Sequence, residues 1–384
     1  MSFTKKIISW YLHNKRDLPW RETKDPYKIW VSEIILQQTR IDQGMAYYYR
    51  FLEQFRTIRE LAAAPEEKVL KIWQGLGYYT RARNMHATAN EIVIKYHGVF
   101  PQDYDSILRL KGIGKYTAAA IGSLAFGLPY AVIDGNVLRF LSRFFGIEES
   151  IDHSRGKKII EQLAGQWMDR KNPGNYNQAL MEFGALQCVP GNPDCSVCPI
   201  KSGCAAFAQG KTNVLPVRSK SLIVRQRYFN YLVLLKSKKN KTGKIWLRKR
   251  TGNDIWKNLY DFPLIESKDA LSEKKLASTP EWKKLFQGKP PQILKIKGPF
   301  KHVLTHQVIN ATFYIIQHTP DSSLPYLEIS IKSLENYPMP RLIEKFVKDL
   351  RNFIILHVNH FYISNGRRTA EKKIIPRYAL LKGS

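Results

Sequence analysis

The sequence predicts a two-domain protein with a mostly helical first half and an α+β second half. In residues 1–187 apolar residues recur at spacings of three and four, and turns that contain glycine or proline interrupt the pattern often. All four cysteines lie at the end of this half. Beyond residue 226 short runs rich in β-branched and aromatic residues appear. The length of 384 residues is sufficient for two cored domains.

These changes of pattern predict the domain boundaries. We expect a helical domain over residues 1–208 that includes a cysteine loop (188–204), a polar linker over 209–226, an α+β domain over 227–350, and a basic tail over 351–384. Within the second domain, strands are predicted from Tyr228 to Leu235, Ile245 to Leu247 and Val308 to Gln317, and a helix from Leu342 to Phe353. The tail carries seven Lys and Arg residues against one Glu.

The charge balance predicts a polyanionic partner. Lys and Arg number 61 against 32 Asp and Glu, which gives a formal net charge of +29. A protein that is merely basic would share this composition. An anionic membrane is a further alternative, although no apolar run reaches membrane-spanning length. The first 20 residues contain no apolar stretch typical of a signal peptide.

The four cysteines form one tight cluster with the spacing Cys188-x6-Cys195-x2-Cys198-x5-Cys204. Such a cluster in a large, cored chain indicates metal ligation in a reducing compartment rather than disulfides, so we expect a cytoplasmic protein, nucleoid-associated if bacterial. Four thiolates suit either zinc or an iron–sulfur cluster. Structural zinc sites usually have two short CxxC pairs; one pair with two longer arms favours a [4Fe–4S] cluster.

The segment Leu110–Ala118 predicts a tight hairpin between two helices. Gly112 and Gly114 permit the turn and allow backbone N–H groups to approach a phosphate at the start of the following helix. Lys111 and Lys115 flank these glycines. A helix–hairpin–helix of this kind binds a DNA phosphate without reading the base sequence.

Asp134 precedes a predicted helix that runs through Phe145, after the apolar lead-in Val132-Ile133. An aspartate in this position is commonly a helix N-cap. The same position also keeps a carboxylate ionised and oriented for catalysis, and Asn136 could orient it further.

The segment Val31–Thr39 predicts a helix with an apolar face and a polar stripe of Glu33, Gln37 and Arg40. A stripe of this kind is usually a solvated face. The adjacent glutamines Gln37 and Gln38 are less usual between aliphatic residues, and their amides are suited to filling the space of a displaced base. The pattern does not decide between these interpretations.

The segment Gly75–Tyr79 predicts another turn, with aromatic residues that are exposed. Aromatic side chains on such turns can wedge into a base stack, although most pack in cores.

Taken together, these motifs resemble those of the adenine DNA glycosylases (the MutY type) of the helix–hairpin–helix superfamily. The likeness is close over residues 1–210 and looser over 226–350. It rests on LPWR (Leu18–Arg21), SEIILQQT (Ser32–Thr39), GLGYY (Gly75–Tyr79), LKGIGKYTA (Leu110–Ala118), VIDGNV (Val132–Val137) and the cysteine spacing. The resemblance implies an all-α helix–hairpin–helix glycosylase core with an iron–sulfur cluster loop, followed by an α+β Nudix-like domain.

The resemblance also implies roles for individual residues. Glu33 matches the general acid that protonates the leaving adenine, and Asp134 matches the carboxylate that stabilises the developing sugar cation. Tyr116 and Asn136 match residues that support this site. Gln38 and Tyr78 match residues that fill and wedge the duplex. The residues expected to contact DNA or a base are Arg21, Gln37, Gln38, Thr39, Tyr78, Lys111, Gly112, Gly114, Lys115, Thr305 and His306, and the four cysteines match ligands of a [4Fe–4S] cluster.

The implied substrate is double-stranded DNA in which adenine lies opposite 8-oxoguanine or guanine, acted on by a monomer. The segments Ile255–Pro263 and Phe300–His306 resemble the family's lesion-recognition domain, which lacks the glutamate-rich box of Nudix hydrolases here. This chain has Leu304-Thr305-His306 where the family usually has Phe-Ser-His, which keeps the hydroxyl and loses the aromatic ring.

Two alternatives remain at the level of sequence. Bifunctional endonuclease-III-type glycosylase/AP lyases of the same fold place a Schiff-base lysine at the position of Tyr116, whereas Lys115 lies one residue earlier. A non-enzymatic DNA-binding protein would keep the hairpin and the charge but would not need Glu33 together with Asp134.

Overall fold

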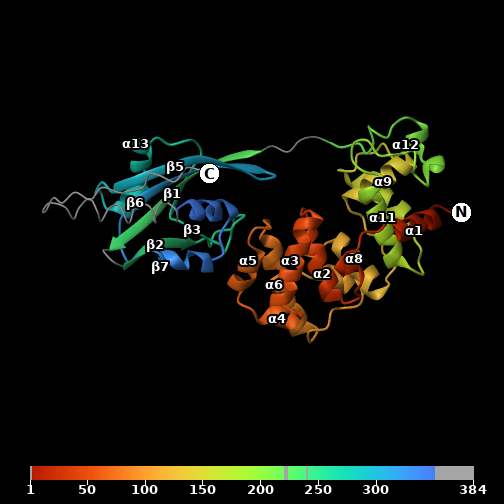
Figure 1. Cartoon of the computed structure of the whole chain (residues 1–384), viewed down its shortest axis with the longest axis horizontal. Coiled ribbons are helices and arrows are strands. Elements are labelled where there is room, and N and C mark those ends of the chain that lie inside the picture. Colours follow the sequence, from red (N-terminus) through yellow and green to blue (C-terminus); the bar gives the residue numbers. More distant parts are fainter. Residues whose placement is uncertain (1, 220–223, 239–240, 351–384) are drawn as a thin grey trace, which may run out of the picture. The chain divides into compact units, whose positions relative to one another are not determined.

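The computed structural model describes residues 2–219, 224–238 and 241–350. The chain divides into two compact units (Figure 1). The first contains the residues up to 223 together with Asn253–Lys257, and the second contains 224–252 and the residues from 258 onward. The predicted basic tail, 351–384, lies outside the described residues.

The first unit is helical throughout, which confirms the predicted class of this half. Its α-helices are α1 (Phe3–Asn14), α2 (Pro26–Leu36), α3 (Ile41–Gln54), α4 (Ile58–Ala63), α5 (Glu66–Trp73), α6 (Thr80–Lys95), α7 (Tyr104–Arg109), α8 (Lys115–Phe126), α9 (Gly135–Phe145), α10 (Ser154–Gln166), α11 (Pro173–Leu186) and α12 (Ala205–Ala208). No helix in the described part of the chain is long and apolar enough to cross a membrane.

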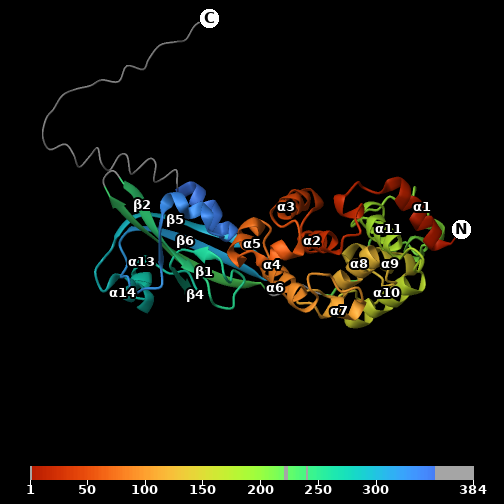
Figure 2. The same cartoon turned by 90° about the horizontal axis from the view of Figure 1, so that it is seen from below.

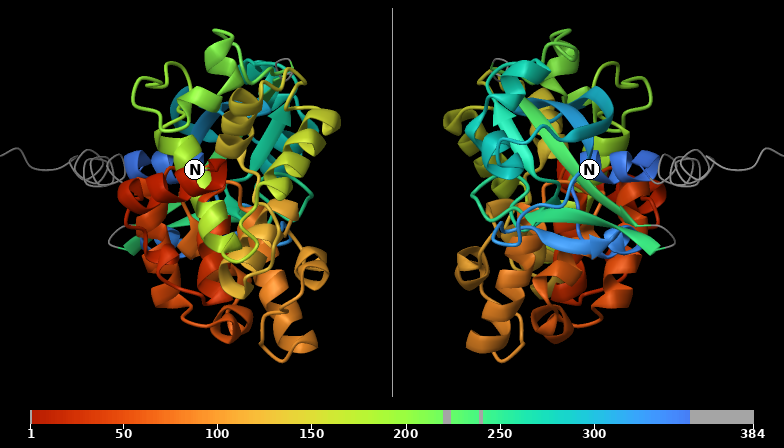
Figure 3. Two further views of the ribbon diagram at one scale, coloured as in Figure 1. Left: turned by 90° about the vertical axis from the view of Figure 1, so that its right-hand side faces the viewer. Right: turned by 90° about the vertical axis from the view of Figure 1, so that its left-hand side faces the viewer.

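Helix α11 is the centre of one part of this unit and packs against α1, α8 and α9 (Figure 3, left). Its apolar face joins Phe3 and Ile7 of α1 and Phe140 of α9 in one buried cluster. Gly184 of α11 allows the closest approach, because a Cβ there would lie 2.6 Å from the carbonyl oxygen of Asn136. The backbone that follows Asp134 is therefore fixed by direct helix–helix contact.

Helix α2 is buried on nearly all its sides. Every residue from Ile29 to Ile35 is buried, including the polar Ser32 and Glu33, and α2 packs against α3 and α8. The helix begins at Pro26, the first-turn position that proline favours, after the Asp25 cap that accepts a hydrogen bond from the backbone of Tyr27. This burial places Glu33 in the interior of the unit.

The second unit is a mixed seven-stranded sheet, which confirms the predicted α+β class. Its elements are β1 (Arg225–Lys238), β2 (Lys241–Lys249), β3 (Tyr260–Asp261), β4 (Leu264–Ser267), α13 (Glu273–Ala277), α14 (Pro280–Phe286), β5 (Gln292–Val303), β6 (Gln307–Gln317) and β7 (Leu327–Ser330). The strand order is β3-β2-β1-β6-β5, with β4 paired to β1 and β7 to β2. Strands β1 and β6 are parallel and the other pairs are antiparallel.

Helices cover both faces of this sheet (Figure 2). Leu232 and Leu234 of β1 pack with Trp282 of α14 on one face. On the other face Phe313 of β6 stacks on Phe346, with ring centroids 3.8 Å apart. Phe346 belongs to a helix over residues 341–350, the described part of the helix that was predicted from Leu342. Strands β1 and β6 are buried on both faces, which explains why runs rich in branched and aromatic residues predicted them.

Part of the predicted linker packs on the helical unit. Leu215 is buried, and its carbonyl oxygen accepts a hydrogen bond of 2.9 Å from Nε of Arg143. The carbonyl oxygen of Val217 accepts one of 3.1 Å from the backbone of Ile151. Single backbone hydrogen bonds anchor this segment, so it shows no periodicity in the sequence.

The close contact at Gly184 generates a prediction about stability. Gly184→Ala is expected to lower the free energy of unfolding by about 1–3 kcal/mol, because the new Cβ would collide with backbone. Gly165→Ala in α10 is the matched control: nothing lies within 4 Å of its Cβ position, so we expect a gain of up to about 1 kcal/mol. Urea unfolding followed by the helical circular dichroism signal measures both. Equal effects of the two substitutions would contradict this account of α11.

Candidate active site

Glu33 is buried within α2, with 6% of its surface exposed, so the interpretation of its stripe as a solvated face is wrong. The helix ends at Leu36, and Gln37 is its C-cap. Gln37 and Arg40 therefore do not continue a helical stripe from Glu33. The predicted helix was too long because the sequence has no glycine or proline to mark its end.

The Glu33 carboxyl accepts a hydrogen bond of 2.6 Å at Oε2 from the Tyr116 hydroxyl. Burial raises the pKa of Glu33 to about 7, and the hydrogen bond from Tyr116 opposes this rise. Burial also raises the pKa of Tyr116 well above its ordinary value, so the phenol keeps its proton and remains a donor. Glu33 can thus hold or release a proton near neutral pH.

Asp134 is the N-cap of α9, and both of its carboxylate oxygens accept hydrogen bonds. The backbone N–H of Val137 donates to Oδ1 (2.7 Å), and Nδ2 of Asn136 donates to Oδ2 (2.8 Å). Burial raises the pKa of Asp134, whereas these two hydrogen bonds lower it. The capping and catalytic interpretations are compatible, because the cap fixes the carboxylate at the helix start.

The fold brings these groups together, although they are far apart in the sequence. The charge of Asp134 further raises the pKa of Glu33 and also that of Tyr116. Packing of α2 against α8, and of α11 against both α8 and α9, produces this proximity. The buried Glu33 carboxyl, held by the Tyr116 phenol, and the partly buried Asp134 carboxyl, held at the start of α9, form the centre of the candidate site.

Arg139 extends the site toward the cysteine loop and was missed by sequence reasoning. Its Nη2 donates to Oδ1 of Asn136 (3.0 Å) and to the carbonyl oxygen of Gly184, and its Nε donates to the carbonyl oxygen of Cys188 (2.9 Å). One buried guanidinium therefore joins the partner of Asp134 to the start of the cysteine loop. The signal in the sequence was the i, i+3 spacing of Asn136 and Arg139.

The predicted hairpin is present between α7 and α8. Gly112 has φ +77°, and a Cβ there would meet the Asn84 side chain, so glycine is needed; Gly114 has an open surface. Lys111 and Lys115 are exposed, and the carbonyl oxygen of Lys111 accepts a hydrogen bond from Thr88. The glycines of the hairpin are thus exposed, and α6 anchors the hairpin through the hydrogen bond from Thr88.

The predicted base-filling and wedging residues lie on turns with left-handed backbone. Gln38 has φ 58° and Tyr78 has φ 47°, and both side chains are exposed. Nε2 of Gln37 donates to Oγ1 of Thr117 at 3.4 Å, and Oγ1 of Thr39 donates to the carbonyl oxygen of Gln37. The expectation that the aromatics of Gly75–Tyr79 are exposed holds for Tyr78 only, because Tyr79 is buried.

Arg21 is not on an open DNA-facing surface. Its side chain is 8% exposed, and its guanidinium forms an ion pair of 2.7 Å with Glu182 and donates to Oε1 of Gln178 (3.0 Å). Glu182 is held by Arg16 as well, and these arginines lower its pKa to about 2 against the effect of burial. Contact of Arg21 with a base inside a pocket stays a prediction. Sequence offered no signal for Glu182.

Thr305 and His306 are exposed in the tight turn between β5 and β6. The backbone N–H of Leu304 donates to the carbonyl oxygen of Gln307 (2.9 Å), which closes the turn. The backbone N–H of Arg225 donates to the carbonyl oxygen of His306 (3.0 Å), which ties the turn to the start of β1.

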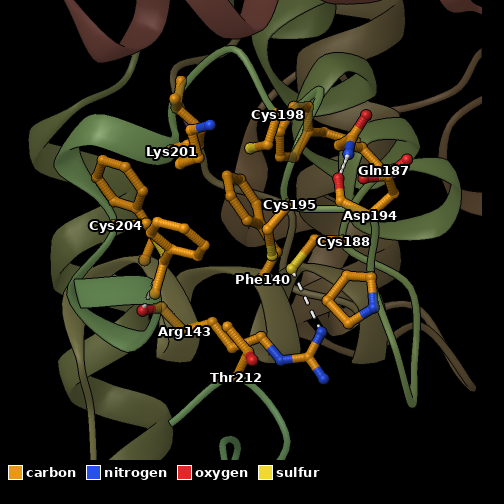
Figure 4. Close-up of a pocket in the computed structure, with 15 residues that line it drawn as sticks. Phe140, Arg143, Gln187, Cys188, Asp194, Cys195, Cys198, Lys201, Cys204 and Thr212 are labelled. Carbon is orange, nitrogen blue, oxygen red and sulfur yellow. Dashed lines mark hydrogen bonds between the residues drawn. The ribbon is translucent and has the colours of Figure 1, made fainter. Parts of the chain in front are cut away.

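The four cysteines line one cavity (Figure 4). Its apolar wall includes Phe140, Phe144 and Ile200, and Nη1 of Arg143 lies 3.5 Å from the sulfur of Cys188. The loop returns to the same place because its prolines and glycines turn the chain sharply. Loops that carry the cysteines lie beside α9 and α12 (Figures 1 and 3).

Four cysteines around one cavity are a donor set that suits a metal centre, either a polynuclear cluster or a single zinc ion. Tetrahedral zinc requires sulfurs that close around one point at about 2.3 Å. Among the described residues, no three Cys, His, Asp or Glu side chains converge closely enough to hold one metal ion. Thiolates that hold a cluster bind different iron atoms. The buried Arg143 guanidinium would offset part of the negative charge of such a group.

Comparison with protein families assigns both units. Residues 31–167 match the HhH-GPD superfamily of base excision DNA repair proteins, and residues 233–349 match the NUDIX domain. The first match contains Glu33, the hairpin and Asp134.

Individual proteins are similar over most of the chain. An adenine DNA glycosylase of Buchnera aphidicola subsp. Baizongia pistaciae is 37% identical over 326 residues, which cover 82% of this chain and 86% of the relative. The human adenine DNA glycosylase is 39% identical over 214 residues, which cover 53% of this chain and 39% of the human protein's length. Among solved structures, a thermostable thymine-DNA glycosylase superposes with a TM-score of 0.51 at 30% identity, over 54% of this chain and 95% of its own.

The geometry of Glu33 predicts the effect of removing its phenol partner. Tyr116→Phe deletes the hydrogen bond that lowers the pKa of Glu33, so this pKa is expected to rise above about 7. Titration of ¹³C-labelled glutamate carboxyls by NMR measures it, and Tyr130→Phe is the control. An unchanged or lower pKa in Tyr116→Phe would show that the hydrogen bond is absent in solution.

Proposed function

Because this chain belongs to the family of adenine DNA glycosylases, we propose that it hydrolyses the N-glycosidic bond of adenine in double-stranded DNA, where the adenine lies opposite 8-oxoguanine or guanine. It is a base excision repair glycosylase by family. The observation that carries the proposal is the buried Glu33, whose pKa is raised to about 7 next to Asp134.

Glu33 is proposed as the general acid. Cleavage of the bond leaves negative charge on the departing base, so a proton must be supplied there. At neutral pH a substantial fraction of Glu33 is protonated, and Tyr116 keeps its carboxyl oriented through the 2.6 Å hydrogen bond. After proton transfer the carboxylate is stabilised by the same hydrogen bond, since the phenol donates to it.

Asp134 is proposed to stabilise the positive charge that develops on the sugar. The hydrogen bonds from Val137 and Asn136, together with the positive end of α9, favour its ionised form against the effect of burial. An acid and a carboxylate in different environments are the pair of groups that cleavage through an oxocarbenium-like state requires. The base must leave the stack for both to reach it.

The exposed hairpin and turns support DNA binding. Backbone N–H groups at Gly112 and Gly114 are proposed to bind a phosphate, with Lys111 and Lys115 beside them. Gln38 and Tyr78 are proposed to fill and wedge the space that the extruded adenine leaves. Gln37, Thr39 and Arg21 are proposed to contact the bases around the site.

A monofunctional mechanism is favoured over a lyase. The residue that hydrogen-bonds Glu33 is a phenol and not an amine, so the site has no Schiff-base nucleophile at this position. Lys115 is exposed and pairs with Glu161 at 3.8 Å. Thr305 and His306 are proposed to read 8-oxoguanine, because they are exposed on a turn of the NUDIX-like unit.

Cys188, Cys195, Cys198 and Cys204 are proposed to hold a [4Fe–4S] cluster. When bound, this group would cross-link the end of α11, the loop after it and α12 through iron–thiolate bonds. The protein residues then act structurally: Arg139 joins the backbone of Cys188 to Asn136, the partner of Asp134.

Glu33→Gln tests the proposed chemistry. The variant is expected to bind DNA within about threefold of the parent and to lose adenine release, since an amide cannot supply the proton. Single-turnover assays on duplexes with adenine opposite 8-oxoguanine, guanine or thymine, with and without alkali, measure release and strand breaks. Breaks that form without alkali would contradict the monofunctional mechanism, and activity retained by Glu33→Gln would contradict the acid.

The cluster proposal makes a separate prediction. Protein purified without oxygen is expected to be brown, with four iron atoms per chain by elemental analysis. Cys198→Ala should lose this absorption and melt at a lower temperature, because the loop loses a cross-link. Ser196→Ala is the control in the same loop. Colourless protein that contains one zinc per chain would overturn the proposal.

A further inference from the structure

Arg81, in the first turn of α6, closes the end of α2. Its Nη1 donates to the carbonyl oxygens of Ile34 (2.7 Å) and Gln37 (2.6 Å), with a longer contact to that of Ile35 (3.2 Å). Carbonyls at a helix C-terminus lack partners within the helix and attract a cation. The guanidinium therefore fixes the end of the helix that carries Glu33.

The same side chain also holds a second turn. Its Nη2 donates to the carbonyl oxygens of Leu76 (3.4 Å) and Gly77 (3.3 Å). The guanidinium carbon lies 5.1 Å from the ring centre of Trp73 and 5.6 Å from that of Tyr78. One partly buried cation thus connects the chain before Gln38 to the chain before Tyr78.

Both turns contain a strained residue next to a carbonyl that Arg81 binds. Gln38 (φ 58°) follows Gln37, and Tyr78 (φ 47°) follows Gly77. A left-handed conformation is unfavourable for residues other than glycine and persists only where the surroundings enforce it. The five carbonyl contacts of Arg81 provide this enforcement from the interior, leaving both side chains exposed.

We propose that Arg81 is a positioning residue that sets both DNA-inserting turns before DNA binds and thereby lowers the cost of extruding the adenine. The inference rests on the proposed function, which assigns insertion to Gln38 and Tyr78. Arg81 acts through these turns and does not contact DNA, because both of its Nη groups already bind carbonyls and its Nε is buried. A planar guanidinium reaches carbonyls on both turns at once, whereas a lysine amine is a point donor.

The test compares Arg81→Met and Arg81→Lys on two substrates under single-turnover conditions. In a duplex with adenine opposite 8-oxoguanine, Arg81→Met is expected to release adenine about ten- to a hundredfold more slowly, with Arg81→Lys intermediate. Opposite a tetrahydrofuran abasic analogue the adenine is unpaired and easily extruded, so the deficit should shrink to about threefold or less. The release rates on both substrates are measured at several pH values. The fall of the rate at alkaline pH, the alkaline limb of the pH–rate profile, is expected to occur at the same pH in the variants as in the parent.

Arg59→Met is the matched control. Arg59 also donates to the carbonyl oxygen of a left-handed residue, His97 (φ 54°), but at the opposite end of α6. The Arg59→Met variant should therefore release adenine at the parental rate from both substrates. Thermal melting reports folding, and if Arg81→Met does not fold, Arg81→Lys carries the comparison. In a Glu33→Gln background, the fluorescence of 2-aminopurine next to the adenine reports extrusion directly and should fall with Arg81→Met.

Three outcomes would overturn the inference: parental rates in the Arg81 variants, an equal deficit on both substrates, or a shifted alkaline limb. Parental rates would mean that both turns keep their conformation without Arg81. An equal deficit or a shifted alkaline limb would mean that Arg81 acts on the chemical step. Failure of the proposed function is a different result, because the parent protein would then release no adenine from either duplex.

Discussion

The structure depends most on the burial of Glu33 beside Tyr116 and Asp134. A carboxyl group in this environment costs stability when ionised, because it lies inside α2 and has one strong hydrogen bond to compensate. Its pKa is raised from 4.5 to about 7, so the folded state gains stability below pH 4.5 and loses it as pH rises toward 7. The packing of α2, α8, α9 and α11 offsets the free-energy cost of burying this carboxyl group.

Arginines account for much of what connects the site to its surroundings. Arg139 joins Asn136 to the cysteine loop, Arg143 lies against the cysteine cavity, and Arg81 connects the two exposed turns. Each donates to backbone carbonyls from a buried or half-buried position, and Arg139 also holds the side chain of Asn136. A guanidinium suits this purpose because its donors spread over a fixed plane.

Sequence predicted the helical and α+β units, the hairpin, the start of α9 and the clustering of the cysteines, since these follow from periodicity, composition, glycine positions and spacing. It could not predict the end of α2 or the burial of Tyr79, because both depend on tertiary contacts. The partners of Arg21 and Arg81 were also out of reach: Glu182 lies 161 residues from Arg21, and backbone carbonyls carry no sequence signal. The same limit applies to the 209–219 segment, which single hydrogen bonds anchor.

The measurement that tests the central claim most directly is the pH dependence of adenine release in a single turnover, with substrate bound at every pH. The account predicts a rate that falls with increasing pH through an apparent pKa near 7, the value that burial gives to the Glu33 carboxyl. A rate that stays constant up to pH 9 would show that no buried carboxyl donates the proton, and the two-carboxyl account of this site would then fail.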